Sequence, residues 1–96
     1  GTALLFGEGE EEARVQLLTG KAAGEDVPLE RGWALEVVTG ATRNLMMFSE
    51  LGELSVGEVA LKGAGALLTW RDGELVSALL ADGSEVTVGS RTLRTE

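Results

Sequence analysis

The stretch EVTVGSRTL at residues 85–93 decides the fold, because ELSVGEVAL at residues 53–61 nearly repeats it. In each stretch, apolar residues alternate with polar ones up to a glycine, Gly57 or Gly89, and then continue with the opposite parity. A strand has a period of two residues, so a change of parity requires a bulge, a bend or a turn. Glycine tolerates the backbone angles that these need. We therefore expect both glycines to be corners with positive φ, where one strand ends and another begins on a different face.

The offset between these two stretches, from Glu53 to Glu85, extends over the whole chain. Three similar stretches open successive segments, namely ALLF at 3–6, ALEVV at 34–38 and ALLTW at 66–70. Three others close these segments, namely VPLERG at 27–32, VALKGAG at 59–65 and RTLRTE at 91–96. Self-similarity at a fixed period, here about 32 residues, indicates a repeat architecture. We interpret residues 1–96 as a single domain of three repeats, 1–32, 33–64 and 65–96.

The turn signals indicate strands rather than helices, because they recur roughly every 8–12 residues, the spacing of sandwiches, barrels and rolls. Asp72-Gly73 and Asp82-Gly83 flank the stretch ELVSALL at 74–80, and Asp-Gly between apolar runs is a hairpin signal. Because residues 74–80 are apolar on both faces, we expect them to form a central strand. The stretch ATRNLMMFSEL at 41–51 contains helix formers, but its repeat partner is strand-like, so we expect a strand there too.

The expected fold class is all-β, a small roll or short solenoid of three stacked repeats. A threefold barrel such as a trefoil is the alternative, although repeats of this length are short for one. Composition agrees with many tight turns, since the chain has fourteen glycines and one proline. Its 44% hydrophobic content is sufficient for a folded core, which Leu, Val and Ala must fill because only two Trp and two Phe are present.

Several function classes are disfavoured by composition. The net charge of −8 and the scattered basic residues provide no stripe that could neutralise a nucleic-acid backbone. The chain has no His, Cys or Tyr, which removes the commonest general base, the usual zinc ligands and thiol nucleophiles. The run GEGEEE at 7–12 lacks the ligand spacing of calcium loops, so we expect a solvated loop. We therefore expect no enzyme, no cofactor and no metal.

The pattern resembles that of a FecR-type domain, a β-rich extracytoplasmic module of iron-uptake sensors and other envelope proteins. The similar stretches are VPLERGWAL at 27–35, TGATRNLMMFSELGELSVG at 39–57 and ADGSEVTVGSRTL at 81–93. In the second stretch Leu51-Gly52 replaces the Asp-Gly of the family, which weakens the likeness there. The resemblance covers residues 27–93, about two thirds of the chain. It implies sensing or protein contact at a cell envelope, without catalytic residues.

The expected function is therefore a non-enzymatic protein-interaction or sensor module, extracytoplasmic at a cell envelope. The alternative is a structural assembly subunit of a filament, coat or capsid decoration that joins its neighbours by β edges. No apolar run approaches the ~20 residues of a membrane span, so a membrane would be reached only through a segment outside this sequence. Because the chain begins at Gly1 rather than Met, we expect a processed or excised piece.

Both functions would use an exposed strand edge. The stretch TALLF at 2–6 has no charge and no proline to protect it, so we expect it to pair with a partner protein or a second copy. Leu4 and Phe6 are its candidate contact residues. Trp70 stands beside Arg71 and just before a turn, and a tryptophan exposed at such a place would be a candidate partner anchor. Core or rim packing is the more frequent role of such a tryptophan, so Trp70 would be an anchor only if it is exposed.

Overall fold

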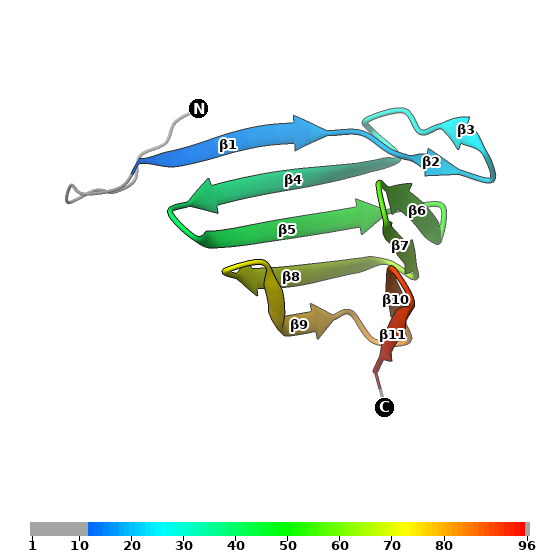
Figure 1. Ribbon diagram of the computed structural model, residues 1–96. Helices are drawn as coiled ribbons and strands as arrows, with labels where there is room; N and C mark the ends of the chain where they lie inside the picture. Colours follow the sequence, from blue (N-terminus) through cyan, green and yellow to red (C-terminus); the bar gives the residue numbers. More distant parts are fainter. Residues whose placement is uncertain (1–11, 96) are drawn as a thin grey trace.

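The computed structural model describes residues 12–95, and all of its regular secondary structure in that range is β-strand (Figure 1). Five longer strands are β1 (Ala13–Leu18), β4 (Gly32–Thr39), β5 (Thr42–Ser49), β8 (Gly65–Arg71) and β9 (Glu74–Leu80). Six shorter strands are β2 (Lys21–Ala22), β3 (Glu25–Asp26), β6 (Glu53–Val56), β7 (Val59–Lys62), β10 (Glu85–Val88) and β11 (Arg91–Arg94). The all-β prediction is confirmed, including the strand within residues 41–51.

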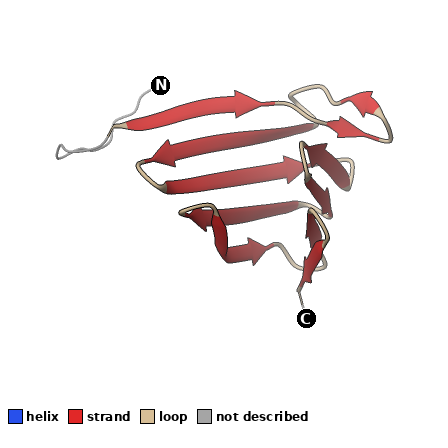
Figure 2. Ribbon diagram, in the orientation of Figure 1, coloured by secondary structure: helices blue, strands red, loops and turns tan. Residues whose placement is uncertain are grey.

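The strands form two antiparallel sheets, which we call the long sheet and the short sheet. The long sheet has the strand order β1-β4-β5-β8-β9, and the short sheet has the order β11-β10-β7-β6-β2-β3. Both sheets are open in the described range, so the closed-barrel alternative is wrong. Figure 2 shows the short hairpins gathered at one end of the long strands and running across their direction. The chain alternates between the sheets, with a long hairpin followed by a short one.

Gly57 and Gly89 sit in two-residue turns, each of which closes a short hairpin. Val56 pairs with Val59 around the first turn, and Val88 pairs with Arg91 around the second. The φ angles are +59° at Gly57 and +61° at Gly89. Such turns match the right-handed twist of the flanking strands, and a glycine at the first central position is their usual solution. The prediction of positive φ at both glycines is confirmed.

The prediction that the strands around these glycines face different sides is wrong. Leu54 pairs with Leu61, and residues directly opposite in an antiparallel pair point to the same face. Because the turn has two residues, paired positions such as 54 and 61 differ by an odd number. The apolar residues therefore change from even to odd positions along the chain, while their side chains stay on the same face of the sheet. The Asp72-Gly73 hairpin is confirmed, since it joins β8 to β9. Asp82-Gly83 instead lies in the connection from the long sheet to the short sheet.

The core lies between the two sheets and is made almost entirely of aliphatic side chains. The long sheet contributes Ala34, Leu45, Met47, Ala66, Leu68 and Trp70, and the short sheet contributes Leu54, Val59, Leu61 and Val86. Each side chain in this set is at least nine-tenths buried. We call the side of the long sheet that carries these residues its inner face. Burial of this apolar surface is the main term that stabilises the two-sheet stack.

The prediction that residues 74–80 form a central strand is wrong, because β9 is an edge strand of the long sheet. Its register against β8 shifts between Thr69 and Trp70, as at a β-bulge. Its apolar outward residues are exposed, with 58% of Val76 and 64% of Leu79 accessible. Apolar residues on both faces would allow other elements to pack on both sides of the strand. In this chain the exposed Leu79 shows that nothing in the described range packs on one of these sides.

The strand bounds recur at the offset found in the sequence. Strands β6 and β10 begin at Glu53 and Glu85, and strands β7 and β11 begin at Val59 and Arg91. Strands β4 and β8, which begin at Gly32 and Gly65, follow nearly the same spacing. The first of the three repeats includes residues 1–11, which lie outside the described residues. The threefold repeat and its solenoid-like stacking therefore stay predictions.

Candidate interaction surface

The side of the long sheet that faces away from the short sheet, its outer face, carries several exposed apolar side chains. Residues directly opposite across antiparallel strands share a face, so the register identifies its rows. One row crosses all five strands and consists of Leu17, Leu35, Met46, Leu67 and Leu79. We call this row the apolar row. Every residue in it has a side chain that would be expected in a core.

The apolar row is open to solvent, most of all at its two ends. Leu17 on β1 is 52% exposed and Leu79 on β9 is 64% exposed, while Met46 on the central strand is 42% exposed. Leu35 and Leu67, on the strands between, are half-buried. Isolated exposed leucines are normal on protein surfaces, but a contiguous row across a sheet is not. The row is therefore a candidate contact surface.

An aromatic pair flanks the apolar row on the side nearest the short hairpins. Trp33 on β4 and Phe48 on β5 are register partners, and their ring centroids lie 5.8 Å apart in a stacked arrangement. Beside Trp33, a hollow of about 300 Å³ is lined by Leu17, Leu29 and Leu35 as well. Aromatic side chains next to aliphatic pockets are the usual anchors of protein–protein contacts.

On its other side the apolar row is followed by a half-polar row. This row reads Val15, Val37, Asn44, Thr69 and Ser77 from β1 to β9. The Thr69 hydroxyl donates a hydrogen bond of 2.7 Å to the Asn44 side-chain carbonyl, so these two polar groups satisfy each other. Neither this row nor the apolar row contains a charged residue. The charged groups that flank them belong to other rows or to the inner face.

Charged residues on the inner face include Arg43 and Glu36, and the Arg43 side chain covers Trp70. The Arg43 guanidinium carbon lies 4.3 Å from the centroid of the Trp70 ring system. The Arg43 Nε donates a hydrogen bond of 2.6 Å to the Glu36 carboxylate, which holds the guanidinium in place. A cation over an indole face is attracted by the ring quadrupole. Trp70 is only 7% exposed as a result, and it belongs to the core cluster.

Of the residues predicted to contact a partner, the structure describes Trp70 and Arg71. Because Trp70 is buried, it is a core residue and not an exposed anchor, so that expectation is corrected. Arg71 is exposed at the end of β8, beside the β8–β9 turn. Leu4 and Phe6 lie outside the described residues. Sequence reasoning missed the outer face, although the run LMMF at 45–48, which is apolar on both faces, was a signal that could have found it.

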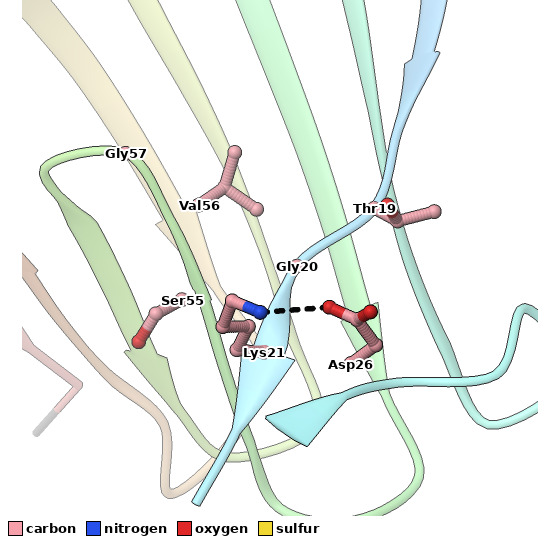
Figure 3. Close-up of a pocket in the computed structure, with 7 residues that line it drawn as sticks. All are labelled: Thr19, Gly20, Lys21, Asp26, Ser55, Val56 and Gly57. Atoms are coloured by element: carbon pink, nitrogen blue, oxygen red, sulfur yellow. Dashed lines mark hydrogen bonds and ion pairs between the residues drawn. The ribbon is translucent and has the colours of Figure 1, made fainter. Parts of the chain in front are cut away.

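A second, polar hollow of about 280 Å³ lies where β2 and β3 meet the β6–β7 turn (Figure 3). Its two charged groups are paired, with 2.8 Å between the Lys21 Nζ and the Asp26 Oδ1. The hydrogen bond from Lys21, with its positive charge, lowers the pKa of the Asp26 carboxyl below its ordinary value. Both side chains are largely exposed. A pair that neutralises itself in solvent leaves little for a ligand to recognise.

The described range offers no cluster for metal binding, since no three acidic, His or Cys side chains there are arranged to hold an ion. Among residues 12–95 there is also no helix that could cross a membrane. Protein-family models, curated protein sequences and solved structures were each compared with the chain, and none matches. The outer face of the long sheet is accordingly the feature on which a function can be argued.

Proposed function

We propose that the protein is a non-enzymatic contact module that binds another protein surface with the outer face of its long sheet. The single observation that carries this proposal is the uncharged apolar row, which spans all five strands and has its most exposed members at the two edges. A soluble domain gains free energy when such a surface is removed from water. The centres of protein interfaces are likewise depleted of charge and enriched in aromatic residues.

The place and role of this contact follow from the sequence resemblance. The FecR-like pattern over residues 27–93 supports a sensor or interaction domain on the extracytoplasmic side of a cell envelope. In that role the outer face would receive the neighbouring component of the sensing machinery. The short sheet, which packs on one end of the inner face, would hold the long sheet in shape while its outer face is engaged.

The proposal is tested by photocrosslinking of the full chain in the cells that produce it. Leu79 is replaced by the photoreactive residue p-benzoyl-phenylalanine, and Ala60 is replaced in the same way as a control. Ala60 is exposed on β7 of the short sheet, between the buried Val59 and Leu61, so it faces away from the core. We expect a covalent adduct of discrete mass from position 79 and none from position 60. Equal labelling at both positions, or no adduct at 79, would contradict the proposal.

A second candidate function, a structural assembly subunit joined through β edges, is favoured by strand β1. Within the described range β1 is an edge of the long sheet, and six consecutive residues pair with β4 without a register shift. A regular edge of this kind is a template for another strand, whereas the bulge beside β9 interrupts the opposite edge. The expected pairing of residues 2–6 with a partner protein or a second copy, which either function would use, concerns residues outside the described range and stays a prediction. Negative-stain electron microscopy distinguishes the assembly candidate, because assembly through edges yields extended filaments.

A further inference from the structure

We infer that the occupant of the outer face is a second copy of this chain, so that two long sheets pack face to face in a symmetric dimer. This inference rests on the proposed function and names the partner of the same surface. The arrangement is that of a sheet sandwich, in which two faces lie about 10 Å apart with interdigitating side chains. Each copy would keep its own inner core, and the outer faces would form a third apolar layer between them.

The width of the exposed row disfavours a single helix or strand that lies parallel to the sheet strands. Five strands at a spacing of about 4.8 Å make the sheet about 19 Å wide. A helix in that direction would cover only about 10–12 Å of this width with its side chains, and an added strand would cover less. Because Leu17 and Leu79 at the two edges are the most exposed members of the row, the occupant must reach both. A second five-stranded sheet has the required width.

The chemistry of the row is self-complementary, as a two-fold contact demands. In an isologous dimer the same patch meets itself, so every group must tolerate its own kind across the interface. From edge to edge the row reads Leu17, Leu35, Met46, Leu67 and Leu79, and therefore has the same side-chain type at both ends and a flexible methionine at its centre. Methionine adapts to irregular gaps. The row meets aliphatic side chains when the two-fold axis runs along the row or perpendicular to it in the plane of the sheet.

Charge also favours a second copy over a charged partner. The chain carries a net charge of −8, so two copies repel one another unless the contact avoids their carboxylates. The apolar row and the half-polar row beside it contain no charged residue, and the one polar pair on this face, Asn44 with Thr69, is internally hydrogen-bonded. Face-to-face packing of these rows therefore brings no like charges together, and the Thr69 hydroxyl and the Asn44 carbonyl keep each other as hydrogen-bond partners.

The size of the face is sufficient for a stable dimer. The longest strands, of eight residues, are about 27 Å long and the others have six or seven residues, so a sheet about 19 Å wide presents at most about 500 Å² in projection. The accessible area of a surface with protruding side chains is greater than its projection. Standard interfaces remove roughly 800 Å² from each partner, and the aromatic pair and Leu29 extend the apolar area at one end. The outer face is thus of the size that a small specific dimer uses.

The experiment measures the mass of the purified full chain by sedimentation equilibrium, from low micromolar to high micromolar concentration. We expect a dimer of twice 10.0 kDa, about 20 kDa, that dissociates on dilution. Leu79→Lys should raise the dissociation constant at least tenfold, because it places two lysines in an apolar interface. Ala60→Lys adds the same charge on the short sheet and should leave dimerisation unchanged. Circular dichroism checks that each variant keeps its β structure.

Three outcomes would overturn the second-copy inference. The wild-type chain could stay monomeric at high micromolar concentration, or its dimer could resist Leu79→Lys, or the monomer could bind phosphatidylcholine vesicles through Leu79 instead. Photocrosslinking separates these results from a failure of the proposed function. An adduct at position 79 with a different protein would agree with the proposed contact module and would contradict only the inference that the occupant is a second copy. As an independent readout, dilution of the isotope-labelled dimer should shift the NMR signals of the apolar row and spare those of Val59 and Leu61.

Discussion

Individual residues in this chain act mainly by controlling backbone geometry and by covering one another. Gly57 and Gly89 hold positive φ angles in turns where a side chain would meet almost no neighbouring atoms. Glycine is therefore required at these positions by the backbone conformation and not by lack of space, because positive φ angles are costly for other residues. Trp70 shows the second kind of action, since the guanidinium of Arg43 lies over its ring and is itself held by the carboxylate of Glu36.

We predict that Gly89→Val lowers the free energy of unfolding by about 1 kcal/mol or more, because a β-branched residue reaches positive φ only with strain. Gly57→Val should behave alike, since its turn has the same geometry. The measurement is urea unfolding followed by circular dichroism. Ser90→Val is the matched control, as it lies in the same turn without a positive φ. A neutral or stabilising Gly89→Val would mean that the turn relaxes to another type.

The elements of the fold are hairpins, and their unequal lengths explain the architecture. Strands β4 and β5 pair over eight residues, whereas the hairpin of β6 and β7 has four pairs. A short strand can cover only part of a long one, so the short sheet covers one end of the inner face. At the other end of the inner face, the Arg43 guanidinium lies over Trp70 and forms an ion pair with Glu36. The outer face has no second hairpin set above it in the described range.

The sheet positions predict a gradient of amide hydrogen exchange. The amides of β5 are bonded on both sides, by β4 and by β8, and Leu45 and Met47 on this strand are buried. The two-residue strands β2 and β3 lie at an edge of the short sheet and are largely exposed. We therefore expect exchange at β5 to be slower than at β2 and β3 by orders of magnitude. Equal protection in the two regions, measured by NMR, would show that the edge hairpin is covered by contacts beyond these strands.

At the scale of the whole molecule, the two sheets depend on one shared core. The four buried side chains of the short sheet pack in the same cluster as those of the long sheet. Neither sheet has a second buried cluster among the described residues, so neither has a core of its own. Small domains with a single core unfold cooperatively. The long sheet and the short sheet should therefore be lost together.

We predict that Leu68→Ala destabilises both sheets at once, by about 2–5 kcal/mol, because it leaves a cavity at a fully buried position. Tryptophan fluorescence reports on the long sheet, which carries both Trp33 and Trp70, and methyl NMR signals of Val86 report on the short sheet. The two probes should give one coincident transition. Val76→Ala, at a 58% exposed position, should change stability by less than about 0.5 kcal/mol. Separate transitions would contradict the single-core description.

Much of this structure could be predicted from local sequence alone. The positive φ of Gly57 and Gly89 and the Asp72-Gly73 hairpin depend on residues within a few positions of one another. The strand within residues 41–51 was instead predicted from its repeat partner, because its own residues include helix formers. Turn chemistry and two-residue periodicity are properties of adjacent residues, so they can be read without knowing which strands pair. The offset between the two similar stretches also anticipated the matching bounds of the two short hairpins at 53–62 and 85–94.

The candidate site, in contrast, depends on pairings that only the tertiary structure decides. Leu17, Met46 and Leu79 lie far apart in the sequence and form one row only because β1, β5 and β9 enter the same sheet in a particular register. Whether an apolar face is covered depends on where the other sheet packs, and alternation along one strand does not contain that information. For the same reason Trp70 is buried and Leu79 is bare, although both belong to apolar strands. Local residues determine the strands and turns, whereas the free energy of burying one face of the long sheet decides which side remains exposed.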